Sequence, residues 1–503
     1  MKFHIMAFVG FLSLQLNAQS DPKTVFDQKF PSHMVQEDLR MLKAGLEKIH
    51  PGLYRYTTKK TLDSLFTKVQ SLSNFPMTYR AFYREICNLV ALIKCQHTIA
   101  TPDSELLGKI MDKGRFFPLK IFWEFDPAKA YVVSDFSSMA DLSPGTQIVS
   151  INGKSIADIY DKLIPYFPSD GEIRSNKHSR LQTGMEFQFW YYLLMDSAEH
   201  FTVELKGKDG GTFAKILKAV TQEEWKGNYK KYTSHENPEI RKYLDHYGAK
   251  ERAMRENPIR YEFLSDDIAL LTVGNFYSPK FKALVHKAFK KIKDKGVGNL
   301  IVDVRNNGGG NDDLGRHLLS YLVDRPTAYL DSLYTNAGIA DTTFLFKHTD
   351  KNAEWMKVTL PFVEQMEDGR FATLPTAHQG LLLQQPNENR FQGNLYVLMN
   401  GRSASTTAEF TSVLHFNKRA IFIGEESGGA YHGGHGGDFA QLRLPNTKIT
   451  VQLPLSKYVM NSKETKFIGK GTLPDYPIQT TVRDILELRD PQLDVALKLL
   501  KEN

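Results

Sequence analysis

The stretch LIVDVRNNGGGNDD, Leu300 to Asp313, decides the fold class of this chain. A fully apolar run leads into three consecutive glycines and then into a segment with helical periodicity, which is typical of a buried strand followed by a helix. Glycines in such a turn let the backbone approach another group closely and turn its N–H groups outward, as in phosphate loops and oxyanion holes. A phosphate loop fits poorly, because no Lys-Ser/Thr pair follows and the glycines lack the spacing of a dinucleotide fingerprint.

The segments on either side of this stretch alternate between strand-like and helix-like patterns. The predicted elements are strands at Ile268–Val273 and Asn299–Val304 and helices at Pro279–Ile292 and Asp312–Leu322. Such alternation predicts an α/β layer with parallel strands. A long polar insertion, roughly residues 341 to 390, separates this unit from a second strand-turn-helix at residues 394 to 416.

The second unit, NLYVLMNGRSASTTAEF, places a serine at a strand-to-helix turn. Taken alone, Ser405 is most often an N-cap, whose side chain satisfies the first backbone N–H groups of the helix. The same turn also exposes the nucleophile of hydrolases, because the helix dipole and the next N–H group then face a developing oxyanion. An oxyanion hole needs a second N–H donor, and Gly309 at the neighbouring strand end could supply it.

Residues 36 to 98 repeat apolar positions at helical spacing, which predicts a small helical domain within residues 22–112. The HPG triplet that starts at His50 ends its first helix, because proline forces the preceding residue out of the helical region, and no functional role is needed for His50. The two cysteines, Cys87 and Cys95, lie eight positions apart in what the pattern predicts as one helix, too far to form a disulfide. Their number excludes a zinc site built from four thiolates.

The segment PGTQIVSINGKSIADI, residues 144 to 159, reads as a turn, a strand, a tight Asn-Gly hairpin and a helix over Ile156–Leu163. It resembles the carboxylate-binding end of a PDZ domain, which predicts a PDZ-like domain over residues 115–215 that adds a peptide strand to a sheet edge. An ordinary strand-turn-helix is the alternative. The polar residues that follow, 216–259, are predicted to be a linker or a surface helix pair.

Length and composition set the broad class: 503 residues, 57.3 kDa and 41% apolar residues allow two or three domains with real cores. The net charge of +7 is spread along the chain and does not imply a nucleic-acid partner.

The first 18 residues carry Lys2, an apolar run and a small Ala18, which resembles a secretory signal peptide. The run is shorter than the ~20 residues of a membrane span, so we expect export to a periplasm or to the outside of the cell.

Three strings together resemble a known family. DVRNNGGG is followed about a hundred residues later by NGRSASTTAEF and then by FIGEESGG, which ends at Gly429. This combination is similar to the carboxy-terminal processing (tail-specific) proteases and the tricorn protease core, over residues 260–503 and extending to the N-terminal helices. The resemblance implies an α/β fold with a ClpP/crotonase-like ββα core, an N-terminal helical domain, a PDZ-like domain and no cofactor.

The same resemblance implies the site residues. Ser405, in the Ser-Ala-Ser string, is the nucleophile of a serine peptidase, and the N–H groups of Gly309 and Thr406 are the two oxyanion donors. Members with a Ser-Lys dyad carry a lysine after the Gly-Glu pair, but Ala430 stands there in this chain. Tricorn-like members use a histidine near the end of the helical domain, and His97 in KCQHT fits that position, so we predict His97 as the base.

Other residues compete for the remaining roles. His432 and His435, in AYHGGHGGD, are rival bases, and this pair predicts no metal site because the sequence offers no third ligand beside it. Tricorn-like members also orient the histidine through a serine and a glutamate. Gln96 occupies the place of that serine and can still hydrogen-bond, and Glu464 is the carboxylate nearest to the region of that glutamate.

The leading hypothesis is an exported serine peptidase that captures extended polypeptide at sheet edges and cleaves it through an acyl-enzyme on Ser405. One alternative is a non-catalytic peptide-binding relative that kept the fold and lost the base, which the missing lysine and Gln96 favour. Another is a hydrolase of small esters or lipids with the insertion at 341 to 390 as a lid, although no lipase-type GxSxG string is present. The sequence predicts no oligomeric state.

Overall fold

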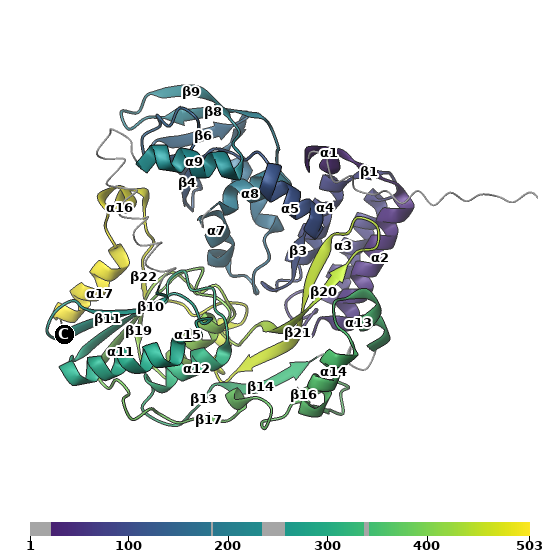
Figure 1. Ribbon diagram of the computed structural model, residues 1–503. Helices are drawn as coiled ribbons and strands as arrows, with labels where there is room; N and C mark the ends of the chain where they lie inside the picture. Colours follow the sequence, from purple (N-terminus) through teal and green to yellow (C-terminus); the bar gives the residue numbers. More distant parts are fainter. Residues whose placement is uncertain (1–21, 183–184, 234–256, 336–341, 503) are drawn as a thin grey trace, which may run out of the picture.

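The computed structural model describes residues 22–182, 185–233, 257–335 and 342–502. The expected signal peptide, residues 1–18, and residues 234–256 of the polar stretch lie outside them. Within the described part, no helix is both long enough and apolar enough to cross a membrane. The described chain forms N-terminal helices, an antiparallel sheet in the middle of the sequence and an α/β layer (Figure 1). A further sheet with two long strands, β20 (His435–Arg443) and β21 (Thr450–Met460), lies between the α/β layer and the N-terminal helices (Figure 1).

The α/β layer is built on a six-stranded sheet in the order β10-β11-β12-β18-β19-β22. Its strands are β10 (Ile259–Phe263), β11 (Ile268–Val273), β12 (Asn299–Asp303), β18 (Asn394–Met399), β19 (Ile421–Gly424) and β22 (Tyr476–Pro477). β10 pairs antiparallel with β11, and every other neighbouring pair is parallel. The predicted α/β class is therefore confirmed.

Helices cover both faces of this sheet. The apolar side chains of α11 (Phe281–Lys295), α12 (Asp312–Ser320) and α15 (Thr406–Phe416) pack on one face, and those of α17 (Pro491–Glu502) pack on the other. Burial on both faces explains why the central strands are apolar at almost every position. The strands and helices predicted between residues 268 and 322 are confirmed to within about three residues.

The turns that follow β12 and β18 meet at one edge of the sheet, because parallel neighbours end on the same side. Two hydrogen bonds tie the turns together. The Ser403 hydroxyl donates to the carbonyl oxygen of Val304 at 2.9 Å, and the Thr406 hydroxyl donates to that of Gly310 at 2.7 Å. The glycine turn and the serine turn of the sequence therefore converge, as the predicted site requires.

A second sheet, in the order β15-β16-β14-β21-β20, extends from this layer. Its strands are β14 (Leu330–Thr335), β15 (Val363–Gln365), β16 (Phe371–Thr373), β20 (His435–Arg443) and β21 (Thr450–Met460). The insertion at 341 to 390 contributes β15 and β16 together with the helices α13 (Thr342–His348) and α14 (Ala353–Thr359). Part of this insertion is thus built into the sheet.

The N-terminal helices are α2 (Ser32–Ile49), α3 (Lys59–Leu72) and α4 (Tyr79–Ala91), as the apolar periodicity predicted. The prediction that Cys87 and Cys95 share one helix is wrong. α4 ends at Ala91, and Lys94 follows with a left-handed φ of 59°, which turns the chain away from the helix axis. Cys95 therefore lies in the loop after α4, and both cysteines are buried and free.

Strands β20 and β21 reach from the α/β layer to the N-terminal helices (Figure 1). β3 (Ile99–Thr101), directly after the α4 loop, pairs antiparallel with β21. A β-carbon on Gly45 of α2 would lie only 2.5 Å from a Leu442 methyl group of β20. Buried Asp38 of α2 accepts hydrogen bonds from the backbone and hydroxyl of Thr447 at 2.9 and 2.6 Å. These contacts fix the α4 loop against the layer that carries the serine turn.

The middle of the chain forms a sheet in the order β4-β5-β6-β8-β9, with β7 paired to β6. Its strands are β4 (Leu119–Glu124), β5 (Lys129–Asp135), β6 (Gln147–Ile151), β7 (Lys154–Ser155), β8 (His200–Lys206) and β9 (Thr212–Lys218). The hairpin at Asn152 and Gly153 has the positive φ angles of 49° and 72° that its sequence predicted. Helix α6 spans Ile156–Leu163 as predicted. The PDZ-like assignment remains a prediction.

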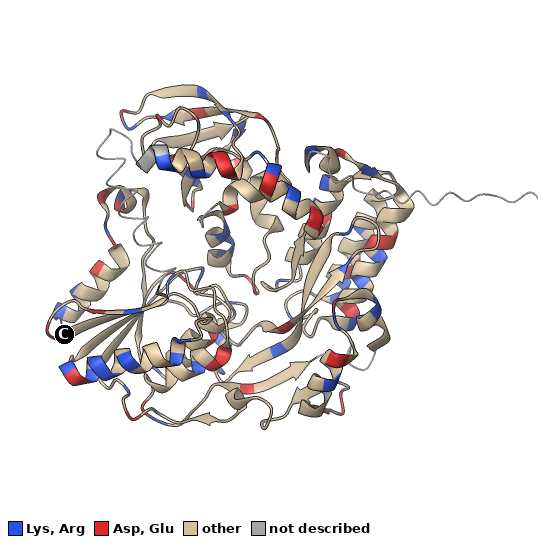
Figure 2. Ribbon diagram, in the orientation of Figure 1, with Lys and Arg blue, Asp and Glu red and all other residues tan. Residues whose placement is uncertain are grey.

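Charged residues of both signs are distributed over all parts of the molecule, and the densest run of lysines lies on α11 (Figure 2). Arg305, in the turn after β12, is a charged residue whose guanidinium is largely buried. It contacts Asp303 and Asp490 at 2.6 Å each, and these two carboxylates raise its pKa against the effect of burial. Arg305 thereby joins the glycine turn to the start of α17.

Candidate active site

Ser405 lies between β18 and α15 with backbone angles φ 55° and ψ −129°. A positive φ is unusual for serine, and holding a residue in such a sparsely populated region costs about 1–3 kcal/mol. Its side chain makes no cap hydrogen bond, and its hydroxyl has no hydrogen-bond partner among the described residues. The N-cap interpretation therefore fails, and the turn instead presents a free hydroxyl at the N-terminus of a helix, as a nucleophile requires.

Gly309 packs directly against this turn. A β-carbon at Gly309 would lie 2.7 Å from the Ser405 β-carbon and 3.0 Å from the backbone nitrogen of Thr406. The N–H group of Gly309, however, donates to the Asn307 side-chain oxygen at 2.9 Å. Gly309 was predicted to donate its N–H group to an oxyanion, but this N–H group is already paired in the structure. Within the described residues, the N–H groups of Gly310 and Thr406 make no hydrogen bond and are free to donate beside Ser405.

We expect Gly309→Ala to lower kcat/KM by about 10²-fold or more and to lower the Tm, because a side chain there displaces the nucleophile and its φ of 98° disfavours alanine. Gly308→Ala is the matched control. An added β-carbon at Gly308 meets no atom within 4 Å, so its losses should be much smaller. Peptidase assays and thermal melts of both variants test this prediction. Equal losses of kcat/KM and Tm in the two variants would contradict it.

Ser405 opens into a cavity of about 670 Å³ that also receives residues from the N-terminal helical domain. His97, in the loop between α4 and β3, lines the same cavity, and so does His435 at the start of β20. The Gln452 side chain of β21 donates to the carbonyl oxygen of His97 at 3.0 Å. The pairing of β3 with β21 is therefore what brings the predicted base and the predicted nucleophile together.

The electrostatic environment of His97 favours the neutral ring. Burial lowers its pKa, whereas the nearby Asp170 carboxylate and a hydrogen bond with the backbone of His435 act in the opposite direction. Its Nδ1 atom is buried and has no hydrogen-bond partner in the described part of the chain. A neutral imidazole can accept a proton, which is the property that a general base needs.

Asp170, a fully buried carboxylate that the sequence analysis missed, lies behind His97. One oxygen accepts a hydrogen bond from the backbone N–H of Gln96 at 2.9 Å, and the other accepts from the Gln96 side chain at 2.9 Å and the Ala430 N–H at 3.3 Å. Gln96 thus does hydrogen-bond, as predicted for its amide. No local pattern singles out Asp170, because 74 residues separate it from Gln96.

Glu464 does not reach the cavity. Its carboxylate forms an ion pair with Lys466 at 2.9 Å and lies close to the side chain of His415. The hydrogen bond with Lys466 lowers the pKa of Glu464. His432 is also absent from the cavity wall. The predicted third catalytic residue is therefore not placed beside His97, and Asp170 takes the position near the base that was expected for it.

A second acidic group lines the cavity one helical turn after the nucleophile. Burial and the neighbouring Asp312 raise the pKa of Glu409 to about 8, so its carboxyl group is largely protonated at neutral pH. Asp312 lies 2.8 Å from Nε2 of His378. A protonated Glu409 can donate a hydrogen bond, in addition to the N–H groups of the serine turn.

The fold and this site define a serine-type peptidase. Residues 267–478 match the model of peptidase family S41. The resemblance to carboxy-terminal processing proteases is thereby confirmed. A search of curated protein sequences finds no significant match.

Two solved structures share the fold over most of the chain. Mature CPAF complexed with lactacystin has 16% identity and a TM-score of 0.63, covering 94% of this chain and 98% of that chain. Mature CPAF alone has 16% identity and a TM-score of 0.60, covering 90% and 94% respectively. At this identity the likeness is one of fold, and it includes the parts of the chain outside the family match.

Proposed function

We propose that this chain cleaves polypeptides through an acyl-enzyme on Ser405, with His97 as the general base. The observation that carries the proposal is the unpaired Ser405 hydroxyl, held on a strained turn in the same cavity as His97. The chemistry begins when the hydroxyl oxygen attacks the scissile carbonyl carbon and its proton passes to the imidazole. The imidazolium then gives that proton to the leaving amine, and water, activated by the same ring, releases the acyl group.

The developing oxyanion needs donors that are not already paired. The N–H groups of Gly310 and Thr406 meet this condition and lie on the two converging turns, and the dipole of α15 adds to their effect. We therefore propose Gly310 and Thr406 as the donor pair. Gly309 then serves by leaving room for Ser405, rather than by donating its own N–H group.

Asp170 is proposed to orient the base. It holds Gln96, the residue before His97, through both the backbone and the side chain of that glutamine. Its negative charge also favours the imidazolium that forms during attack. We further propose that the mature enzyme is exported, on the basis of its first 18 residues.

A serine-directed organophosphonate probe tests the proposal. Wild type should be labelled on one residue, and Ser405→Ala should not be labelled. Ser332→Ala is the matched control and should be labelled as wild type, because the Ser332 side chain lies outside the cavity. Wild type should also digest casein, and Ser405→Ala should not. Failure to label any of the three proteins would favour the non-catalytic peptide-binding alternative, and hydrolysis of a short-chain nitrophenyl ester alone would favour the esterase.

A further inference from the structure

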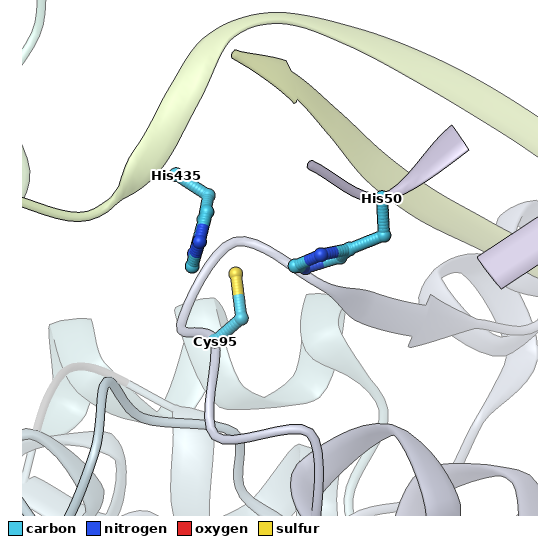
Figure 3. A group of neighbouring side chains, drawn as sticks. All are labelled: His50, Cys95 and His435. Carbon is cyan, nitrogen blue, oxygen red and sulfur yellow. The ribbon is translucent and has the colours of Figure 1, made fainter. Parts of the chain in front are cut away.

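Three metal-binding side chains converge beside the cavity from three distant parts of the chain. His50 ends α2, Cys95 lies in the loop after α4, and His435 begins β20. One ligand atom from each, an imidazole nitrogen or the thiol sulfur, lies within 4.8 Å of the other two. Figure 3 shows both rings and the sulfur pointing toward a common point. The sequence analysis found no third ligand for His435 and assigned His50 no role.

The cluster is buried, and three of its ring nitrogens are unpaired. His50, Cys95 and His435 are 3%, 1% and 2% exposed. Nε2 of His50 and both ring nitrogens of His435 have no hydrogen-bond partner among the described residues. Buried polar atoms are almost always paired in folded proteins, because leaving them unpaired is costly. Unpaired nitrogens on two rings beside a buried sulfur therefore call for a bound group.

The surrounding chain accommodates the rings closely. The ring centroids of His50 and His435 are 4.9 Å apart. A β-carbon at Gly52 would lie 1.9 Å from Nε2 of His435, so only glycine fits at that position of the HPG bend. The bend that ends α2 thus both aims His50 at the cluster and makes room for His435.

We propose that His50, Cys95 and His435 bind a zinc ion that braces the active-site loop. Two imidazoles and one thiolate are a donor set that zinc prefers, with a water molecule completing a tetrahedron. Ligand atoms around tetrahedral zinc are roughly 3.5 Å apart, so the three side chains need only close in slightly. The inference goes beyond the peptidase activity and does not depend on Ser405.

Proton movements accompany binding. Burial and the nearby Asp170 raise the pKa of the Cys95 thiol to about 12, and hydrogen bonds with the backbone of His97 and Thr98 only partly offset them. Zinc must therefore displace the thiol proton to solvent when it binds. The Gly52 N–H donates to Nδ1 of His50 at 3.1 Å, which leaves the proton of the neutral ring on Nε2. When zinc takes Nε2, this hydrogen bond is given up and the ring proton moves to Nδ1, where the carbonyl oxygen of His50 can accept it. Asp170 lies near Cys95, and Arg55 and Lys457 lie near His435.

The position of the cluster explains what the ion does. Cys95 is two residues before His97, and the backbone of His435 hydrogen-bonds to the His97 ring. Zinc therefore links the end of α2, the loop that carries the base and the start of β20 in the second sheet. We expect it to act on the stability and placement of this loop and not on the substrate.

Metal content and thermal melting test the site. The chelator-treated full chain is titrated with Zn²⁺, and wild type should bind about one ion per chain with a higher Tm. Cys95→Ser and His435→Gln should lose both effects. Cys87→Ser and His432→Gln are matched controls, because Cys87 is the other buried cysteine and His432 lies outside the cluster, and both should behave as wild type. Ser405→Ala should also bind zinc normally, which separates this test from that of the peptidase.

Cobalt spectroscopy provides a test that needs no variant to fold. Co²⁺ added to the metal-free wild type should give a thiolate-to-cobalt charge-transfer band and the visible bands of a tetrahedral site, and Zn²⁺ should displace it. Absence of the thiolate band, or zinc binding that persists unchanged in Cys95→Ser, would overturn the proposal. Lack of any zinc-dependent Tm shift in wild type would do the same.

Discussion

His97→Ala is expected to lower kcat/KM for peptide hydrolysis by about 10³-fold while leaving the fold intact, because general-base catalysis contributes 10²–10⁴-fold to such reactions. His97 is only half-buried and carried on a loop, so its removal should change the Tm little. Steady-state kinetics with a fluorogenic peptide measure the loss. His432→Ala is the matched control, since His432 does not line the cavity, and it should retain wild-type kcat/KM.

The pH profile tests whether a histidine of lowered pKa acts as the base. Burial lowers the pKa of His97, so the ring stays neutral and active down to below the ordinary histidine value of about 6.5. We expect kcat/KM to be flat near neutral pH and to fall on the acidic side with a midpoint below about 6.5. Full turnover in His97→Ala would show that His97 is not the base.

Asp170→Asn is expected to lower kcat by about 10²-fold or more. The amide keeps the shape of the carboxylate but has one acceptor oxygen for three N–H groups and no charge to favour the imidazolium. Glu464→Gln is the matched control and should leave kcat unchanged, because Glu464 pairs with Lys466 outside the cavity.

A purely structural role for Asp170 gives a different result. If Asp170 only supported packing, its variant would lose Tm while the acidic limb of the pH profile stayed in place. An orienting carboxylate predicts that this limb moves to lower pH in Asp170→Asn, because the charge that raises the pKa of His97 is gone. A large kcat loss in Glu464→Gln with none in Asp170→Asn would restore the original prediction for Glu464.

Much of the fold and half of the site could be predicted from local pattern. Apolar runs that end in glycine or serine identified β12, β18 and both turns, and the helix over Ile156–Leu163 was predicted to the residue. The error at Cys95 has a local cause: the apolar spacing continues through Ile93, but Lys94 turns to a left-handed φ after α4 has ended. Periodicity records which residues are buried and does not mark where the hydrogen-bonded helix stops.

By itself the sequence determined the two turns and the identity of the serine between them, because strand, glycine turn and helix start depend on neighbours a few residues apart. Tertiary structure alone decided that Asp170 is the acid near His97 and which N–H groups near Ser405 are unpaired. It also decided that His50, Cys95 and His435 lie close together. Those outcomes depend on β3 pairing with β21 and on side chains up to several hundred positions apart, which packing brings together and no local pattern encodes.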